Sequence, residues 1–151
     1  MLGSFAKKLR ILGFDTQYFR DGTDADLLGL ARRSGRVVIT ADRGLVLKAA
    51  SLRVPSVLAP GESDSRRLNA LVAGMRTLGS EMTAGEPLCT RCGGRLTLID
   101  RENLPRSVPR SVIAKHRDFH RCRDCGWLYW KGTHWKRLRS PRRRLPVQGA
   151  G

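Results

Sequence analysis

The sequence predicts a mixed α/β domain followed by a small β-rich domain. Helical and strand patterns alternate as far as residue 79, which is typical of a parallel sheet with right-handed crossovers. Residues 80–87 are mostly small and polar and form a predicted linker. The only four cysteines then follow as two C-x-x-C pairs, Cys89–Cys92 and Cys122–Cys125. The predicted parts are therefore residues 1–79, the linker, residues 88–138, and a basic tail over 139–151.

Local signals predict the first half of the α/β domain. Phe5–Leu12 carries apolar residues at helical spacing, and Gly13 ends that helix. Asp15–Phe19 is a predicted short strand. Thr23 and Asp26 resemble a capping box that begins the next helix.

The second half continues the alternation. Gly35 ends the helix that Thr23 begins, and Val37–Ile39 is a β-branched run, as expected of a strand buried on both faces. Three further elements complete the domain: a helix at Asp42–Ala50, a strand near Pro55–Leu58, and a helix at Ser65–Leu78.

The four cysteines predict a structural zinc site. Zn²⁺ takes four ligands in a tetrahedron, and an all-cysteine site is closed. Glycines follow both pairs, where a knuckle must turn its backbone toward sulfur: Gly93, Gly94 and Gly126. A disulfide pair and a thioredoxin-like redox motif are the alternatives, but two knuckles at this spacing fit one ion better. Thiolates that bind metal also suit an intracellular protein, and we expect a cytoplasmic location.

The second domain is expected to be a small ribbon that zinc helps to fold. Its predicted strands are Leu96–Ile99 and Trp127–Trp130. Between the knuckles lies a long insertion, Asp100–Arg117, in which Pro105 and Pro109 prevent a continuous helix.

Carboxylates are predicted to gather at the carboxyl edge of the parallel sheet, where ligands bind in such folds. Asp21 and Asp24 follow the strand predicted at Asp15–Phe19, and Asp42 follows the next strand. Gathered carboxylates repel one another unless a cation lies between them, and Mg²⁺ or Mn²⁺ prefers such oxygen ligands. Those ions polarise a phosphodiester and activate water for in-line attack.

The same acids also have a purely structural interpretation. Asp42 begins a helix and suits an N-cap, while Asp24 and Asp26 lie in a first helical turn, where the dipole favours acids. Asp21 precedes Gly22 and suits a turn.

Charge indicates a polyanionic partner. The 151 residues include 29 Lys and Arg against 13 Asp and Glu, which gives a net charge of +16. No apolar stretch approaches the roughly 20 residues that span a bilayer. Early basic residues, Lys7, Lys8 and Arg10, interrupt any signal peptide. We therefore expect no membrane partner.

Two groups of residues are candidates for binding nucleic acid. Near the first strands, Thr40 can hydrogen-bond a phosphate or pair at the strand end, and Arg43 can steer a phosphate or remain solvated. Near the C-terminus, bases and aromatic rings interleave, and such rings stack on unpaired bases. The candidates there are Lys131, His134, Trp135, Lys136, Arg137 and Arg139. For Trp127 and Trp130, packing over a thin core is the competing interpretation.

Several of these motifs together resemble the Mut-seven C-terminal RNase domain family, a branch of the PIN-like nucleases with an appended zinc ribbon. They are Met1-Leu2-Gly3, Leu9–Thr16, Thr40-Ala41-Asp42-Arg43-Gly44-Leu45, the two cysteine pairs, and Tyr129–Trp135. The resemblance extends from Met1 to about Leu138. It implies a PIN-like α/β fold and metal-dependent cleavage of RNA. It also implies that Asp42 and Asp24 are metal-binding catalytic acids, with Asp26 and Asp21 as further candidates.

The sequence departs from the family at its start. Members usually begin with a hydrophobic strand that carries an aspartate just before the Met-Leu-Gly segment, and here that first strand is missing. Either the start codon is assigned too late, or the chain is truncated and its site impaired. The first explanation is favoured, because an uncovered central strand edge is a liability that proteins avoid.

Overall fold

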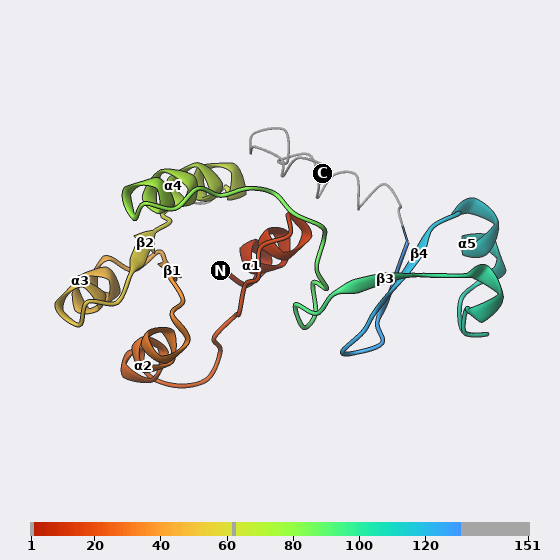
Figure 1. The fold of residues 1–151 in the computed structure, drawn as a ribbon, viewed down its shortest axis with the longest axis horizontal. Coiled ribbons are helices and arrows are strands. Elements are labelled where there is room, and N and C mark those ends of the chain that lie inside the picture. The colour runs from red at the N-terminus through yellow and green to blue at the C-terminus, as the bar shows by residue number, and fades with distance from the viewer. Residues whose placement is uncertain (1, 62, 131–151) are drawn as a thin grey trace. The chain divides into compact units, whose positions relative to one another are not determined.

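The computed structural model describes residues 2–61 and 63–130, and the chain divides into two compact units (Figure 1). The division runs through the first helix. The first unit comprises Met1–Phe5 and Tyr18–Thr83, and the second comprises Ala6–Gln17 and Ala84–Gly151. The domain boundaries expected from the sequence stay a prediction.

The first unit is an α/β arrangement around a two-stranded parallel sheet. Strand β1 pairs with β2 in register, so that Val38 lies opposite Ser56 and Thr40 opposite Leu58. Helix α3 packs on both strands and α4 on β2. The elements in chain order are α1 (Leu2–Ile11), α2 (Asp24–Ser34), β1 (Val38–Thr40), α3 (Arg43–Ser51), β2 (Ser56–Leu58) and α4 (Asp64–Thr77).

Apolar residues from α2, β1, α3 and the loop before β2 form the core of this unit. Each of the six is almost fully removed from solvent: Leu28, Ala31, Val38, Leu45, Ala49 and Val54. Gly74 of α4 faces β2, where a Cβ atom would lie 2.5 Å from Val57 Cγ1. This glycine therefore permits the close approach of α4 to the sheet.

Predicted caps form at the ends of the helices. Thr23 is the N-cap of α2, and its side chain and that of Asp26 make the reciprocal bonds of a capping box. Gly35 ends α2 in the left-handed conformation, with φ of 64°. Asp42 caps α3. These local predictions are confirmed.

The strand predicted at Asp15–Phe19 does not form. Residues 14–20 lie outside any helix or strand. The Thr16 carbonyl accepts a bond from Arg10 Nε at 2.7 Å, and the Thr16 hydroxyl donates to the Phe14 carbonyl at 3.0 Å. Side chains thus take up backbone groups that a strand would use in a ladder. This prediction was wrong.

The second unit contains a three-stranded antiparallel sheet in the order β3-β4-β5. Its elements are β3 (Leu96–Ile99), the 3₁₀ turn η1 (Arg101–Asn103), α5 (Arg110–Lys115), β4 (Phe119–Cys122) and β5 (Leu128–Trp130). Strand β4 was not predicted, although it is central. Phe119, at its start, is fully buried and lies opposite both Ile99 and Trp130. The mixed α/β fold with a separate small β-rich region is confirmed.

Residues 6–17 and the predicted linker are joined by backbone hydrogen bonds. The N–H of Gly85 donates to the Leu12 carbonyl at 2.9 Å, and that of Leu88 donates to the Arg10 carbonyl at 2.8 Å. A Cβ atom on Gly13, whose φ is +89°, would lie 2.5 Å from the Gly85 carbonyl carbon. The small residues at 13 and 85 thus let two backbone segments touch.

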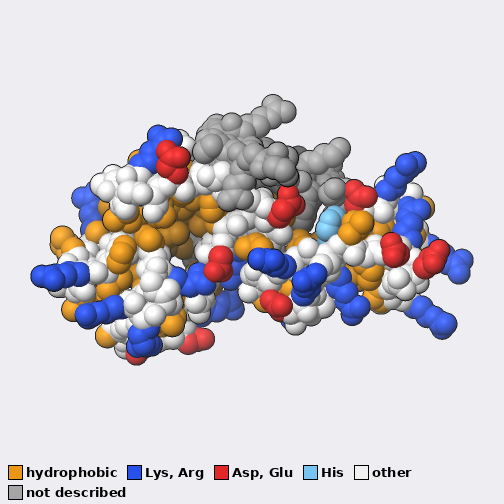
Figure 2. Space-filling model, viewed as in Figure 1, with side chains coloured by type: hydrophobic (Ala, Val, Ile, Leu, Met, Phe, Trp, Pro, Cys, Tyr) orange, Lys and Arg blue, Asp and Glu red, His pale blue; other side chains and the backbone are white. Residues whose placement is uncertain are grey.

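On the face drawn in Figure 2, Lys and Arg side chains are scattered among acidic and hydrophobic ones rather than gathered in one patch. Among the residues that the structure describes, no helix combines the length and the apolar character needed to cross a membrane.

Candidate functional site

The four cysteine sulfurs converge in the second unit. All four Sγ atoms lie within 4.8 Å of one another. Cys89 and Cys125 sulfurs are 3.6 Å apart, and those of Cys92 and Cys122 are 3.4 Å apart. Four ligands at a Zn–S distance of about 2.3 Å would stand about 3.8 Å apart in a tetrahedron. All four cysteines are free, so the structure contains no disulfide between them.

Two matching knuckles present these sulfurs. In the first, Gly93 N–H donates to the Cys89 carbonyl at 2.8 Å; in the second, Gly126 N–H donates to the Cys122 carbonyl at 3.0 Å. Both glycines have positive φ, of 86° and 72°. A left-handed residue four positions after the first cysteine turns the backbone around the sulfurs, and glycine adopts it without steric cost.

Contacts within the cluster shift the pKa values of two thiols in opposite directions. Burial raises the pKa of Cys89, but hydrogen bonds from Tyr129 and from two backbone N–H groups outweigh it and lower the pKa to about 6. For Cys92, the Gly94 N–H lowers the pKa, but burial and the three neighbouring sulfurs raise it to about 12. One sulfur therefore ionises easily only while another keeps its proton. A bound Zn²⁺ lets all four be thiolates, so the residues fit a structural zinc site.

Tyr129 supports the first knuckle from strand β5. Its hydroxyl lies 3.0 Å from Cys89 Sγ and accepts a hydrogen bond from the Thr90 N–H at 3.1 Å. Burial and the adjacent Cys89 sulfur raise the pKa of Tyr129 to about 12, so the hydroxyl keeps its proton as a donor. The sequence analysis did not single out this contact. The alternation of β5, which sends Tyr129 to the face opposite its neighbours, is the signal that indicates it.

Arg10 binds the same knuckle from α1. The side chain is buried, with 8 % of its surface exposed. Its Nη1 donates to the carbonyls of Thr90 at 2.8 Å and Arg91 at 3.3 Å. In the sequence it is one of several basic residues on a helix, so nothing local marks it as buried.

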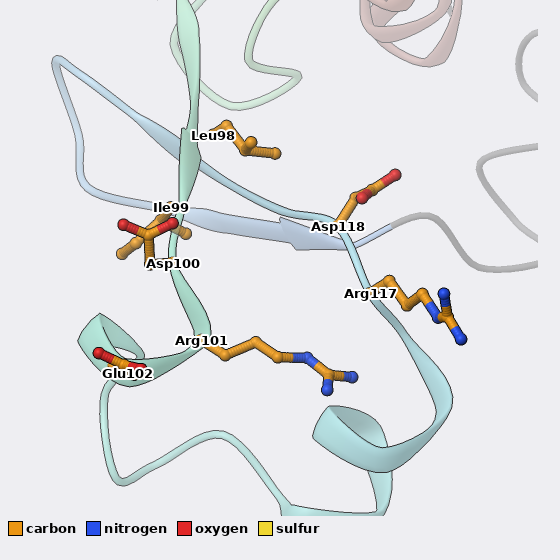
Figure 3. Close-up of a pocket in the computed structure, with 7 residues that line it drawn as sticks. All are labelled: Leu98, Ile99, Asp100, Arg101, Glu102, Arg117 and Asp118. Carbon is orange, nitrogen blue, oxygen red and sulfur yellow. The ribbon is translucent and has the colours of Figure 1, made fainter.

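A pocket of about 350 Å³ lies at the insertion between the knuckles (Figure 3). Arg101, which extends across it toward α5, donates to the carbonyls of Ile113 and His116, both at 2.6 Å. These hydrogen bonds join the start of the insertion to α5 near its end. Acidic and basic side chains alternate around the pocket, which gives it no single charge preference.

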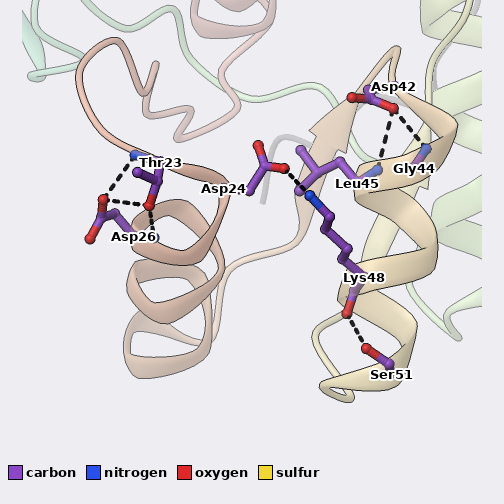
Figure 4. A network of polar contacts seen from close by, with 8 residues as sticks. All are labelled: Thr23, Asp24, Asp26, Asp42, Gly44, Leu45, Lys48 and Ser51. Carbon is purple, nitrogen blue, oxygen red and sulfur yellow. Dashed lines mark hydrogen bonds and ion pairs between the residues drawn. The ribbon is translucent and has the colours of Figure 1, made fainter.

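The candidate acids of the first unit lie near one lysine (Figure 4). Lys48 extends from α3, and its Nζ pairs with Asp24 Oδ2 at 2.7 Å. The hydrogen bond that Lys48 donates to Asp24 and the charges of Asp24 and Asp42 raise the pKa of Lys48. Asp24 and Asp42 thus both influence one ammonium group, and their sharing of a divalent cation stays a prediction.

Three of the candidate acids bind backbone groups or lie in a turn. Asp42 Oδ1 accepts from the N–H groups of Gly44 at 2.7 Å and Leu45 at 3.3 Å. Asp26 Oδ2 accepts from the N–H of Thr23 at 2.8 Å, and the bonds from Thr23 lower the pKa of Asp26. Asp21 lies exposed in the bend before α2. Within residues 2–61 and 63–130, the cysteines form the only group of three or more potential metal ligands.

The predicted nucleic-acid contacts divide into two sets. Thr40 is buried at the end of β1, where its hydroxyl accepts from the Asp42 N–H at 3.0 Å, and Arg43 is exposed at the start of α3. The C-terminal candidates lie outside the described residues: Lys131, His134, Trp135, Lys136, Arg137 and Arg139. Trp127 is 51 % exposed, so packing accounts for only part of its surface.

Comparison with known proteins agrees with this architecture. No curated protein and no solved structure gives a match. The family model described as the Mut7-C RNAse domain matches residues 1–141, nearly the whole chain. That family name indicates nuclease activity, and the cysteine cluster is compatible with structural zinc. The chain belongs to the Mut7-C RNAse domain family.

Proposed function

We propose that the protein is a metal-dependent endoribonuclease whose zinc ribbon and basic tail hold the RNA. Membership of the Mut7-C RNAse domain family is the observation that carries this proposal. Asp24 and Asp42 are the proposed ligands of Mg²⁺ or Mn²⁺, and Asp21 and Asp26 are further candidates. When bound, the ion supplies activation of water and stabilisation of charge on the phosphate.

The shared lysine supports a cation position between the two acids. Asp24 and Asp42 both favour the charged form of Lys48, so a positive group is stabilised at this place. The ion pair is exposed, with 63 % of the Lys48 side chain and 47 % of the Asp24 side chain accessible. Exposed pairs contribute little to stability, so a divalent ion can replace the ammonium group at small cost. Carboxylate oxygens are the donors that Mg²⁺ and Mn²⁺ prefer.

Charge supports RNA as the substrate. The chain carries +16, and a polyanion that neutralises part of that charge releases its own counterions. Arg43 at the start of α3 and the basic tail are proposed to contact phosphates, and Thr40 to hold the strand end near them. The cytoplasmic location expected from the sequence stays a prediction.

The test is cleavage of labelled single-stranded RNA by the zinc-loaded chain with Mn²⁺, before and after an excess of EDTA. Asp42→Asn is the informative variant, because Asn caps a helix about as well as Asp but has no charge for a cation. We expect cleavage to be lost in Asp42→Asn and in Asp24→Asn while both stay folded. Asp64→Asn, in the first turn of α4, is the matched control and should cleave normally. Full activity of Asp42→Asn would refute the assignment of the acids.

A second candidate function is binding of nucleic acid without catalysis. The observation that favours it is the structural use of the acids, since Asp26 and Asp42 cap helices and Asp24 pairs with Lys48. A truncated or inactive PIN-like domain would retain those contacts. RNA binding with no cleavage under any divalent ion, in a chain with full zinc content, would support this candidate over the first.

A further inference from the structure

The two zinc knuckles are alike in backbone but differ in one side chain. The N–H of Cys89 donates to the Gly94 carbonyl at 2.8 Å, and the N–H of Cys122 donates to the Trp127 carbonyl at 2.9 Å. Gly94 and Trp127 therefore occupy equivalent positions, each two residues after the second cysteine of its pair. The first knuckle has no side chain there, and the second has an indole.

Steric contacts explain why residue 94 is a glycine, but they do not explain why residue 127 is a tryptophan. A Cβ atom on Gly94 would lie 2.9 Å from Cys122 Sγ and would also clash with the Asp124 carboxylate. Trp127 meets no such barrier, yet it is 51 % exposed rather than buried. By comparison, Trp130 is 38 % exposed, and its ring lies 6.5 Å from the ring of the fully buried Phe119. The exposure of Trp127 is not explained by the packing of the ribbon.

One arginine side chain adjoins this indole, and a second lies near the glycine that precedes it. The guanidinium carbon of Arg91 lies 4.8 Å from the centroid of the Trp127 ring, within the range of a cation–π interaction. Arg121, on β4, approaches Gly126, where a Cβ atom would be 3.8 Å from its Nε and Nη2. Both knuckles thus contribute to a surface that combines an exposed ring with positive charge.

We propose that Trp127, with Arg91 and Arg121, is a stacking site for an unpaired base of single-stranded RNA. The indole offers a flat aromatic surface that accepts any base, and the two guanidinium groups attract the flanking phosphates. The inference rests on the proposed function, because it names the part of the ribbon that holds the substrate. The chain's +16 charge attracts RNA and acidic protein segments alike, and the exposed ring favours RNA because only RNA offers bases to stack on it.

Binding is measured on the full, zinc-loaded chain with a fluorescein-labelled 12-nucleotide oligouridylate and no added Mg²⁺ or Mn²⁺. Trp127→Ala should weaken binding roughly tenfold, within a range of about 5- to 100-fold. Trp130→Phe, the control, should change affinity less than about twofold, since it keeps an aromatic ring beside Phe119 and leaves Trp127 in place. Arg91→Gln should lower the slope of log affinity against log salt by about one. Unchanged affinity in Trp127→Ala with full zinc content would overturn the proposal.

A second measurement does not depend on how Trp127→Ala folds. The chain has 3 tryptophans, and replacing Trp130 and Trp135 by Phe leaves Trp127 as the only reporter. Saturating oligouridylate should quench Trp127 emission and protect it from acrylamide. Equal protection by poly-glutamate would show a general anion surface and overturn the stacking site.

The two proposals can fail separately. Quenching of Trp127 by RNA without any metal-dependent cleavage would leave the stacking site standing and remove the nuclease. Cleavage that is lost in Asp42→Asn, together with normal RNA binding by Trp127→Ala, would leave the nuclease and remove the stacking site.

Discussion

Arg10 provides the sharpest test of how the first zinc knuckle is held. The side chain is buried and makes bonds to three carbonyls: Thr16 at 2.7 Å, Thr90 at 2.8 Å and Arg91 at 3.3 Å. Arg10→Met keeps most of the apolar stem and removes all three donors. The three partly buried carbonyls then lose the charged side chain that donates hydrogen bonds to them.

The expected loss follows from these bonds. A hydrogen bond to a charged group contributes about 1.5–3 kcal/mol, and the 3.3 Å bond should contribute least. Allowing for water that reaches the freed carbonyls, Arg10→Met should lower the free energy of unfolding by about 3 kcal/mol. Zinc binding and folding are coupled in such sites, so the apparent zinc affinity should fall by about 100-fold.

Two measurements check the prediction. Urea unfolding followed by circular dichroism gives the free energy, and competition with a chromophoric chelator gives the zinc affinity. Arg101→Met is the matched control, because Arg101 also donates to two carbonyls but is exposed on the insertion. It should cost less than about 1 kcal/mol. If both variants lose the same stability and bind zinc equally, Arg10 has no special part in the knuckle.

Four further changes test other contacts. Gly94→Ala would place a Cβ atom 2.9 Å from Cys122 Sγ and should weaken zinc binding about tenfold or more in the chelator assay. Gly74→Ala would overpack α4 on β2 and should cost about 1–3 kcal/mol in urea unfolding. Gly29→Ala, whose nearest neighbour is a flexible arginine tip, should instead stabilise α2. The hydrogen bonds from Thr23 lower the pKa of Asp26, so the stability that its carboxylate contributes is present above the ordinary pKa of aspartate and is lost as the pH falls through the lowered value. The urea midpoints of wild type and Asp26→Asn should therefore differ at pH 7 and converge at low pH.

The features that the sequence predicted well depend on neighbouring residues. The capping box of Thr23 and Asp26, the left-handed Gly35 and the N-cap at Asp42 each involve residues a few positions apart. The cysteine cluster was predicted for a related reason, since each pair already fixes two sulfurs in one turn. The fold then has only to bring the second pair of sulfurs next to the first pair.

The features that were missed depend on distant partners. The strand expected at Asp15–Phe19 failed because Arg10 takes the Thr16 carbonyl that a ladder would need. Strand β4 was overlooked because it directly precedes the second knuckle and because its buried residues, Phe119 and Cys122, do not follow the period-two alternation of a half-buried strand. Lys48 was overlooked because its partner, Asp24, is distant in sequence.

The two kinds of candidate ligand differ in what the fold already provides for them. The four sulfurs crowd together, and their contacts lower the pKa of Cys89 while they raise that of Cys92, so a cation would relieve the repulsion among thiolates. Removing zinc should therefore disrupt the knuckles. The carboxylates of Asp24 and Asp42 already have Lys48 and the first N–H groups of α3 as partners. A divalent ion there adds to helix ends that are folded without it, so its loss should abolish cleavage and leave the first unit intact.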